Sequence, residues 1–395
     1  MDALHTQAIE RATKRFGELL AGEFERIERV KQGGKPKDYA SLDHITIGIL
    51  PGDGIGPTIV QQAVRVLECL LADQIASERI EIRPIDGLTI ERRAELGESL
   101  PQDVLEAALA CDVLLKGPLV TPRPGDPWPN LVSANSLLRR GLDLFVGMRP
   151  IRMPDQGIDW TFFRENLEGE YIWGDKGIQV NDDLAVDFKV CTLPGTERLA
   201  RMALNYARDN GKTTVTVVTK ANIVKHADGN FQKTICDVAE REYPEITVQT
   251  RLVDATAAKL MDPDFNKDFQ VIVLPNLYGD IVTDIAAEHQ GGLGSAASAN
   301  LGTQHALFEA IHGTAPTLAE RGLAPWANPC SVIRAAGLLV GHIGFADRRA
   351  LLERALDICC TTERRVVMGM GDGPTSADFT DYLTETIEGL KGNAA

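Results

Sequence analysis

The segment VIVLPNLYGDIVTD, residues 271–284, combines two kinds of secondary structure in a short stretch. It begins with an apolar, β-branched run of strand length. After Pro275 and Gly279 it continues with two acids, Asp280 and Asp284, that lie four residues apart. If a helix begins near Gly279, this spacing puts both carboxylates on one helix face, one turn apart. A strand that runs into a helix is the repeating unit of an α/β fold.

The two acids have two interpretations. Like charges at this spacing repel each other by a few tenths of a kcal/mol, so the helix gains nothing from them unless a cation lies between them. Alternatively, they form a solvated first turn, because acids near a helix N-terminus are favoured. The segment alone leaves both interpretations open.

The alternation of strands and helices recurs along the chain. HITIGILPGDGIGP (44–57) predicts a strand that enters a glycine turn, followed by an amphipathic helix over 58–73. The GDGIG motif lacks the third glycine of a dinucleotide fingerprint, so it favours a tight strand-to-helix turn over a classical Rossmann fold. Further strands are expected within residues 112–122, 143–151, 160–166, 213–219, 246–253 and 270–277.

Other regions of the chain differ from this alternation of strands and helices. Residues 175–193 contain two short alternating runs around Asn181, Asp182 and Asp183, which predict a protruding β-hairpin. From Pro329 onward the pattern is mainly helical. Residues 1–32 have apolar residues at helical spacing, which predicts an accessory amphipathic helix that ends at Gly33–Pro36. They lack the apolar centre of a signal peptide, and their acids argue against a transit peptide.

Composition excludes several classes of partner. The chain has 395 residues, 44% hydrophobic and 25% charged, as in an ordinary globular protein of two or three domains. A net charge of −15 argues against nucleic acid or an anionic membrane as the main partner. It leaves room for an anionic small substrate, because a local arginine cluster can override the global charge.

The cysteines and the apolar runs indicate the compartment. Seven cysteines are scattered without a CxxC pair, which favours reduced thiols in the cytoplasm. We see no apolar run of the roughly 18–20 residues that a membrane helix needs.

Three arginines indicate a pocket for carboxylates. Ser133, Asn135 and Arg139 are spaced so that one helix could direct a hydroxyl, an amide and a guanidinium to one place. Arg149 and Arg164 follow separate expected strands. Guanidinium binds carboxylate through two parallel hydrogen bonds, so three arginines in an acidic protein suggest a substrate with several carboxylates.

Three further residues carry groups that transfer protons or bind metal. Lys220 ends an apolar β-branched run, where a lysine is costly without a partner or a role. Asp254 likewise follows a short strand, and Tyr171 lies on an expected loop. Tyrosine and lysine can both carry protons once their surroundings adjust their pKa values.

Taken together, these motifs resemble the metal-dependent β-decarboxylating dehydrogenases: isocitrate, 3-isopropylmalate, homoisocitrate and tartrate dehydrogenases. The resemblance runs from about Ile45 to about Leu383. Its motifs are Gly52–Pro57, KGPLVTP (116–122), Arg149–Pro150, RENLEGEY (164–171), Lys220–Asn222, NLYGDIVTD (276–284), GGLGSAASANLG (291–302) and EAIHGTAP (309–316), with Asn328-Pro329 after it.

The resemblance implies roles for the acids and the proton carriers. Asp280 and Asp284 of one subunit and Asp254 of the other would bind Mg²⁺ or Mn²⁺ at an active site shared within a homodimer. Lys220, also from the other subunit, would take the hydroxyl proton while hydride passes to the nicotinamide. Tyr171 would then protonate the carbon that has lost its carboxylate.

The resemblance also implies an architecture. The expected fold is the α/β isocitrate/isopropylmalate dehydrogenase-like fold, with a large cofactor-binding domain over 44–144 and 291–395. A small domain would cover 145–168 and 192–290, and residues 169–191 would form a clasp-like hairpin at the dimer interface. Residues 1–43 are an N-terminal helical extension whose role the resemblance leaves open.

The choice of substrate depends on Ser133 and Asn135. In isocitrate dehydrogenases the matching serine and asparagine meet the γ-carboxylate, and Arg139, Arg149 and Arg164 would bind carboxylates. An isopropyl group would leave a buried hydroxyl and amide unpaired, at a cost of about 1–3 kcal/mol. We therefore expect isocitrate, converted to 2-oxoglutarate and CO₂ as in the tricarboxylic acid cycle. Homoisocitrate stays open, because one methylene is discriminated weakly.

The choice of cofactor depends on the loop after Glu309. Thr317-Leu318 matches neither the aspartate of NAD-specific members nor the Lys-Tyr pair of NADP-specific ones. The missing cation favours NAD, whereas Arg334, Arg364 and Arg365 leave NADP open. The expected cofactor-binding residues are Leu119, Thr121, Asn135, Glu309, His312, Gly313, Thr314, Ala315 and Asn328.

Two other functions are compatible with parts of this sequence. A regulatory subunit of a heteromeric isocitrate dehydrogenase would have lost catalytic groups, whereas every acid, Lys220 and Tyr171 are present here. Malate- or tartrate-type substrates need fewer anion-binding groups than this chain offers.

Overall fold

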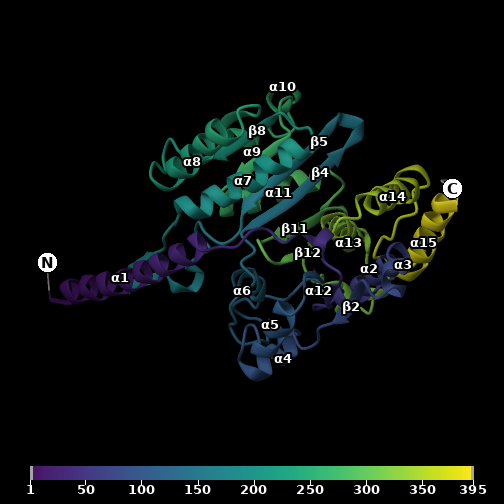
Figure 1. Cartoon of the computed structure of the whole chain (residues 1–395). Coiled ribbons are helices and arrows are strands. Elements are labelled where there is room, and N and C mark those ends of the chain that lie inside the picture. Colours follow the sequence, from purple (N-terminus) through teal and green to yellow (C-terminus); the bar gives the residue numbers. More distant parts are fainter. Residues whose placement is uncertain (1–2, 393–395) are drawn as a thin grey trace. The chain divides into compact units, whose positions relative to one another are not determined.

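The computed structural model describes residues 3–392 of the chain (Figure 1). The chain divides into two compact units. Unit 1 comprises Met1–Lys35 and Phe145–Ala286, and unit 2 comprises Pro36–Leu144 and Ala287–Ala395. The domain boundaries expected from the sequence take in residues 1–2 and 393–395, which lie outside the described residues.

Unit 2 contains five neighbouring strands that are mostly parallel. Its strands follow the order β2 (Ile80–Pro84), β1 (Ile45–Leu50), β3 (Val113–Lys116), β12 (Ala306–Ala310) and β11 (Ala297–Leu301), and only the β11–β12 pair among them is antiparallel. The helices of this unit are α2 (Gly56–Leu70), α3 (Ala72–Ala76), α4 (Ile90–Leu96), α5 (Gln102–Leu109), α6 (Ala134–Gly141), α12 (Pro316–Glu320), α13 (Cys330–His342), α14 (Ala346–Leu356) and α15 (Ser376–Gly392). Short 3₁₀ turns cover Tyr39–Ser41, Leu293–Ser295 and Ala324–Trp326, and a π-helical turn covers Asp357–Thr362.

Unit 1 contains five neighbouring strands of mixed direction. Its strands follow the order β4 (Val146–Met153), β5 (Ile158–Glu165), β10 (Val271–Leu274), β8 (Thr214–Thr219) and β9 (Thr247–Leu252), with β4 antiparallel to β5 and the other pairs parallel. Its helices are α1 (Ala3–Lys31), α7 (Leu193–Asp209), α8 (Ala227–Glu242), α9 (Val253–Lys259), α10 (Pro263–Asn266) and α11 (Asn276–His289, which runs past the boundary of the unit). Short 3₁₀ turns cover Pro154–Gln156 and Gly174–Lys176.

The central strands show why apolar runs become parallel strands. Every residue of β1, β3 and β10 is buried. A strand covered on both faces needs apolar side chains in succession rather than in alternation. The α2 helix, in contrast, buries only one face, which includes Ile59, Ala63, Val66 and Leu70.

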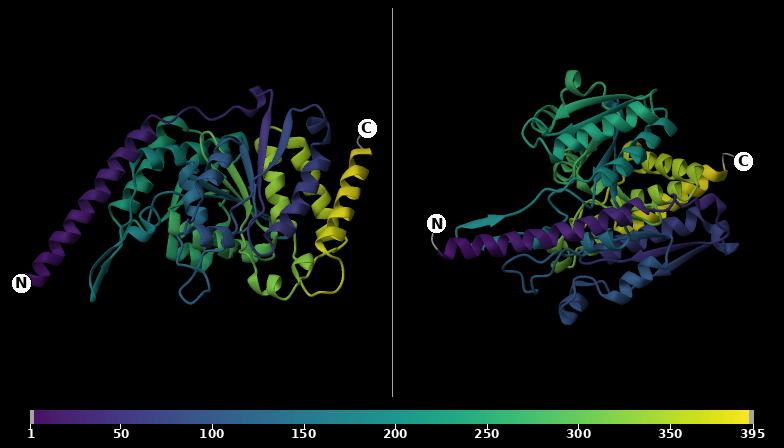
Figure 2. Two further views of the ribbon diagram at one scale, coloured as in Figure 1. Left: turned by 90° about the horizontal axis from the view of Figure 1, so that it is seen from below. Right: turned by 60° about the vertical axis from the view of Figure 1, so that its left-hand side comes forward.

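The N-terminal helix α1 packs onto unit 1 (Figure 2). Leu19 of α1 joins Ile172 and Trp173 in a small apolar cluster with Phe188 and Val190. Phe16 stacks on Phe188 with ring centroids 4.8 Å apart. The predicted accessory helix is therefore confirmed, and it contacts the segment around the hairpin.

Several sequence predictions are confirmed. The hairpin forms from β6 (Ile178–Asn181) and β7 (Leu184–Val186), which are antiparallel. The GDGIG motif is a tight turn between β1 and α2, with Gly52 and Gly54 at φ values of +80° and +61° that a side chain would disfavour. All the strands expected from apolar runs are present.

Other predictions were incomplete or displaced. Strands β2, β11 and β12 were not expected, and β11 has the sequence ASANL, whose alanine and asparagine residues are poor strand formers. The α11 helix begins at Asn276 rather than near Gly279, so Asp280 lies in its second turn and not its first. Across residues 3–392, none of the helices has both the length and the apolar character needed to cross a membrane.

Candidate active site

The structure gathers two arginines and two acids in unit 1, here called the acid–arginine cluster: Arg149, Arg164, Asp280 and Asp284. Nη1 of Arg149 donates to Oδ1 of Asp284 at 2.9 Å, and its Nη2 lies 3.6 Å from Oδ1 of Asp280. Arg164 donates from Nη1 to the same oxygen of Asp280. Both acids therefore lie on one face of α11, as their spacing predicted.

Local structure explains why these side chains meet. Arg149 and Arg164 are on the neighbouring strands β4 and β5, and α11 follows β10, which pairs with β5. Gly279 lets α11 lie against Arg164, because a Cβ at this position would be only 2.6 Å from Cγ of Arg164. The glycine of NLYGD thus makes room for an arginine.

Sequence reasoning gave no role to Asn276, although it lies inside the same motif. It is fully buried, and its Oδ1 accepts hydrogen bonds from Nε and Nη2 of Arg164 at 3.0 and 2.7 Å. Its Nδ2 donates to the carbonyl of Glu168 at 2.9 Å. Asn276 therefore orients Arg164. A polar residue two positions after a buried strand was the signal that could have revealed it.

Tyr171 joins the acid–arginine cluster from the loop after β5. Its hydroxyl donates to Oδ2 of Asp280 at 3.0 Å, and the guanidinium of Arg164 lies 5.5 Å from its ring centroid. Burial, together with the charge and hydrogen bond of Asp280, raises the pKa of Tyr171 to about 12. The side chain is therefore a phenol at neutral pH, as a proton donor must be.

Lys220 and Asp254 form a separate pair in unit 1. Nζ of Lys220 lies 2.7 Å from Oδ1 of Asp254, on the loop after β8 and the first turn of α9. The backbone N–H of Lys220 donates to the buried carboxylate of Asp228 at 2.7 Å. Asp254 thus pairs with the lysine, and the contacts of Asp280 and Asp284 are with the arginines and Tyr171.

The acid–arginine cluster fits a divalent cation. Mg²⁺ and Mn²⁺ prefer carboxylate oxygens and water, and a cation here would compete with the two guanidiniums for the same oxygens. The side chains of Asp280 and Asp284 are 36% and 51% exposed, so these oxygens can be reached. Burial raises the pKa of Asp284, and the like charge of Asp280 adds to the rise. Within residues 3–392 no group of three or more acids, histidines or cysteines is arranged to hold a metal ion.

Ser133 and Asn135 lie at the start of α6 in unit 2. Ser133 occupies the N-cap position, yet its side chain accepts no capping hydrogen bond. Among the described residues, Oδ1 of Asn135 is shielded from solvent and has no hydrogen-bond partner. A buried amide oxygen is costly unless a hydrogen-bond donor reaches it, whereas the amide N–H of the same side chain can donate to an anion.

Arg139 and Glu309 also meet in unit 2. Glu309 lies 3.1 Å from Nη2 of Arg139 and 2.7 Å from Nζ of Lys116, and it accepts a hydrogen bond from Asn300 at 2.7 Å. Burial would raise the pKa of Glu309, but the two cations outweigh it and hold this pKa far below its usual range. Sequence reasoning gave no individual role to Lys116 or Asn300.

The loops expected to bind the cofactor are hydrogen-bonded to the GDGIG turn. Asp53 accepts hydrogen bonds from the backbone N–H of Val120 and from Nη2 of Arg93, at 2.8 and 2.9 Å, and thereby anchors the loop that carries Leu119 and Thr121. Ile55 donates to the carbonyl of Thr314 at 3.1 Å. Asp53 is another residue without a predicted role.

The remaining residues expected to bind the cofactor vary in exposure. Leu119 is buried in the apolar core of unit 2, whereas Thr121 and Gly313 are exposed. His312, Thr314, Ala315 and Asn328 are partly buried, and Ala315 is left-handed at φ +45°.

Two of the three arginines considered for a 2′-phosphate have other partners. Nη1 of Arg334 lies 2.5 Å from Glu353, and Nε of Arg365 lies 3.5 Å from Glu363.

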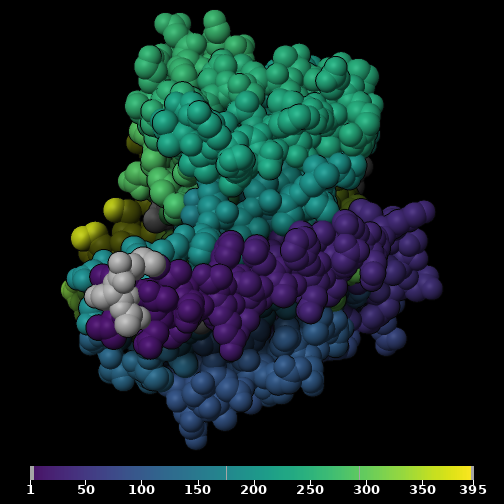
Figure 3. Space-filling view, turned by 90° about the vertical axis from the view of Figure 1, so that its left-hand side faces the viewer, coloured from purple at the N-terminus to yellow at the C-terminus, as the bar shows by residue number. Residues whose placement is uncertain are grey.

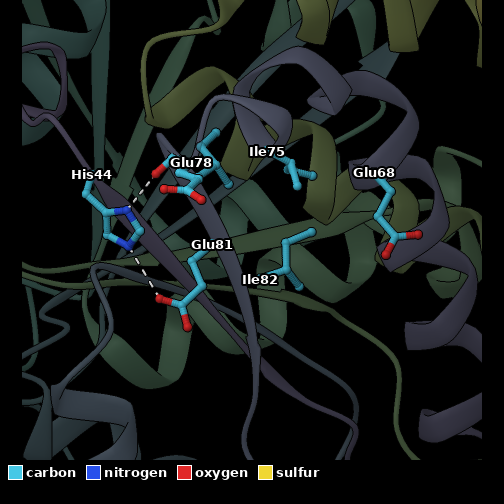
Figure 4. Close-up of a pocket in the computed structure, with 7 residues that line it drawn as sticks. His44, Glu68, Ile75, Glu78, Glu81 and Ile82 are labelled. Carbon is cyan, nitrogen blue, oxygen red and sulfur yellow. Dashed lines mark hydrogen bonds and ion pairs between the residues drawn. The ribbon is translucent and has the colours of Figure 1, made fainter.

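Unit 2 also has a surface pocket apart from these residues (Figure 4). Nδ1 of His44 lies 2.9 Å from the carbonyl oxygen of Glu78, and Nε2 lies 3.3 Å from the carboxylate of Glu81. The hydrogen bond to Glu78 raises the pKa of His44. The other lining residues are Glu68, Ile75, Ile80 and Ile82, and none of the seven is a candidate site residue.

Comparison with known proteins is in line with this geometry. The family described as isocitrate/isopropylmalate dehydrogenase matches residues 46–366. Subunit 2 of the mitochondrial NAD isocitrate dehydrogenase of Schizosaccharomyces pombe is 34% identical, over 87% of this chain and 88% of that protein. The isocitrate/homoisocitrate dehydrogenase of Thermus thermophilus is also 34% identical, over 87% of this chain and 99% of that protein.

A solved structure gives the same result. The isocitrate dehydrogenase of Methylococcus capsulatus has a TM-score of 0.75 and 34% identity, over 87% of this chain and 99% of that chain. The chain therefore belongs to the isocitrate/isopropylmalate dehydrogenase family. Its fold is that of the family, and the family's enzymes are metal-dependent oxidoreductases that act on small molecules with NAD or NADP.

Proposed function

We propose that this protein oxidises isocitrate with NAD and decarboxylates it to 2-oxoglutarate and CO₂, with Mg²⁺ or Mn²⁺ bound at Asp280 and Asp284. The observation that carries the choice of substrate is the hydroxyl of Ser133, which makes no capping hydrogen bond at the start of the helix that also carries Asn135. Polar groups suit a substrate with a third carboxylate, because the Ser133 hydroxyl and the Asn135 amide N–H can donate to it. An isopropyl group would leave them unpaired.

The residues of unit 1 supply the chemistry of binding and proton transfer. Arg149 and Arg164 would bind carboxylates, and Asn276 holds Arg164 in orientation. Lys220 would take the proton of the C2 hydroxyl, directly or through a water. Tyr171 would give a proton to the carbon that has lost CO₂, and Lys220 would restore it. When bound, the cation would stabilise negative charge at the C2 oxygen, and the nicotinamide would accept hydride.

A second copy of the chain would complete the site. Lys220 and Asp254 pair with each other, while Tyr171 contacts Asp280. We propose that Lys220 and Asp254 act at the acid–arginine cluster of the partner in a homodimer, with the β6–β7 hairpin at the interface. A cytoplasmic location and a role in the tricarboxylic acid cycle stay predictions, and the S. pombe relative is named as mitochondrial.

The preference for NAD rests on what the loop and its neighbours lack. Thr317 and Leu318 carry no positive charge, and Arg334 is bound to Glu353. A 2′-phosphate would need a guanidinium or ammonium group that is free to bind it.

The test is steady-state kinetics of the purified chain with isocitrate, homoisocitrate and 3-isopropylmalate, each with NAD and with NADP. We expect the highest kcat/KM for isocitrate with NAD. Isopropylmalate should be slower by roughly 5- to 150-fold, because an unpaired polar group costs about 1–3 kcal/mol. Faster turnover of homoisocitrate would replace the substrate within the same mechanism. No turnover by the chain alone would favour a regulatory subunit.

A further inference from the structure

The N-terminal helix α1 lies outside the family match, which begins at residue 46. The Thermus relative is matched over 99% of its length by 87% of this chain. Yet α1 is docked on unit 1, and one of its sides is open to solvent along the face that Figure 3 shows. Its apolar side chains Leu4, Ile9 and Phe24 are 75%, 47% and 68% exposed.

The side of α1 that packs against the rest of unit 1 places a positively charged side chain next to a buried turn with two acidic residues. Residues Glu165 and Glu168 flank the turn after β5, and they are only 4% and 2% exposed. Glu165 accepts hydrogen bonds from the backbone N–H groups of Leu167 and Glu168. A carboxylate as buried as Glu168 loses its hydration, and the carboxyl group of Glu165 beside it adds repulsion whenever it is charged, so Glu168 needs a counter-charge.

Arg26 of α1 supplies that counter-charge. Its Nη2 donates to Oε1 of Glu168 at 2.6 Å, and its Nε donates to Glu23 at 2.9 Å. Glu23 in turn accepts from the indole Nε1 of Trp173 at 3.2 Å. Lys189 lines a small cavity together with Glu165 and Glu168, but it is paired with Asp228 and Glu170.

Glu168 connects Arg26 to the candidate catalytic groups. Its carboxylate accepts hydrogen bonds from the backbone and the hydroxyl of Thr192, and Gly195 leaves room for it, because a Cβ there would lie 2.2 Å from Oε1. Its carbonyl accepts from Asn276 at 2.9 Å. Tyr171 follows three residues later and reaches Asp280. The turn that Glu168 fixes therefore leads directly to the proposed proton donor.

We propose that Arg26 is a positioning residue for Tyr171: from the added helix α1 it neutralises Glu168 and so holds the turn from Glu165 to Glu168 in place. This inference rests on the proposed function, in which Tyr171 protonates carbon after decarboxylation. The helix thus supports the active site from outside the part of the chain that the family shares.

The test compares Arg26→Met with Arg29→Met in the full-length protein. Arg29 is an exposed cation on the same helix, so the control variant loses the same charge without the contact. Two reactions are measured: overall turnover of isocitrate, and direct reduction of oxalosuccinate by NADH, which needs no protonation of carbon. Tyr171→Phe is the reference for loss of the donor alone.

We expect Arg26→Met to lower overall turnover at least about tenfold while oxalosuccinate reduction and the KM for isocitrate stay within about threefold. This is the pattern expected of Tyr171→Phe. Arg26→Lys, which keeps the charge, should recover part of the turnover. Adding Glu168→Gln to Arg26→Met should also recover turnover, because it removes the carboxylate charge that needs neutralising. The fluorescence of Trp173 should shift in Arg26→Met and not in Arg29→Met.

Equal losses in both reactions would overturn the inference, because they indicate general damage to unit 1. So would turnover of Arg26→Met equal to that of Arg29→Met. If Arg26→Met does not fold, the double variant with Glu168→Gln decides by the same comparison of the two reactions. An inactive wild-type protein would contradict the proposed function, whereas an active wild type with an unaffected Arg26→Met contradicts only the role of Arg26.

Discussion

Replacing Gly279 by alanine should weaken substrate binding through Arg164. Gly279 lies within α11, where alanine is otherwise the better helix former. A Cβ at this position would lie 2.6 Å from Cγ and 2.8 Å from Cβ of Arg164. Ordinary contact begins at 3.4 Å, so the methyl group would be about 0.8 Å too close to Cγ.

The arginine has little freedom to move away. Its side chain is 2% exposed, and Asn276 and Asp280 both accept hydrogen bonds from it. Inserting a methyl group into such packing costs about 1–3 kcal/mol. If about 1–2 kcal/mol of this cost appears as weaker carboxylate binding, the KM for isocitrate rises roughly 5- to 30-fold.

The assay is the KM for isocitrate together with urea unfolding. Gly229→Ala is the matched control, because Gly229 lies in helix α8 of the same unit and a Cβ added to it would meet no atom within 4 Å. The control should leave the KM unchanged and gain up to about 1 kcal/mol of stability. Gly279→Ala with the KM and stability of the control would show that Arg164 does not need this contact.

Three further outcomes follow from particular side chains. Asp280→Asn should lower divalent-metal affinity and kcat by at least about a hundredfold, and near-normal turnover of the wild type in EDTA would exclude the metal assignment. Ser133→Asp would place like charge beside the γ-carboxylate at a cost of several kcal/mol, so an isocitrate KM within about twofold of wild type would remove Ser133 from the site. Burial and the charge of Glu168 raise the pKa of Glu165 from 4.5 to about 8. Between these two pH values the folded protein therefore holds a proton on Glu165 that the unfolded chain has released. The free energy of unfolding should therefore fall as pH rises from about 4.5 to 8, by at most about 1.4 kcal/mol per pH unit; Glu165→Gln should flatten this slope in urea unfolding, and an unchanged slope would contradict the assignment.

The sequence predicted those parts of the fold that depend on local pattern. Apolar β-branched runs such as residues 271–274 became buried parallel strands, and the four-residue spacing of Asp280 and Asp284 put both on one helix face. Strand β11 was not predicted, because alanine and asparagine have a weak strand preference. In the fold, the pairing of β11 with β12 outweighs this preference.

The supporting contacts of the site could not be predicted, since they join residues far apart in the sequence. Arg26 and Glu168 are separated by 142 positions, and Arg164 and Asn276 by 112. Asp53 likewise looked like part of a glycine turn, and only the fold brings it to Arg93 and Val120. Such residues are recognised by the burial of their charge, which a single sequence does not display.

One measurement tests the central claim most directly: the NADH formed and the CO₂ released from isocitrate by the purified chain with Mg²⁺ or Mn²⁺. Oxidative decarboxylation predicts that the two products appear in equal amounts, that 2-oxoglutarate accumulates with them, and that EDTA stops all three together. NADH without CO₂, or neither product from isocitrate while homoisocitrate or isopropylmalate is turned over, would contradict the account.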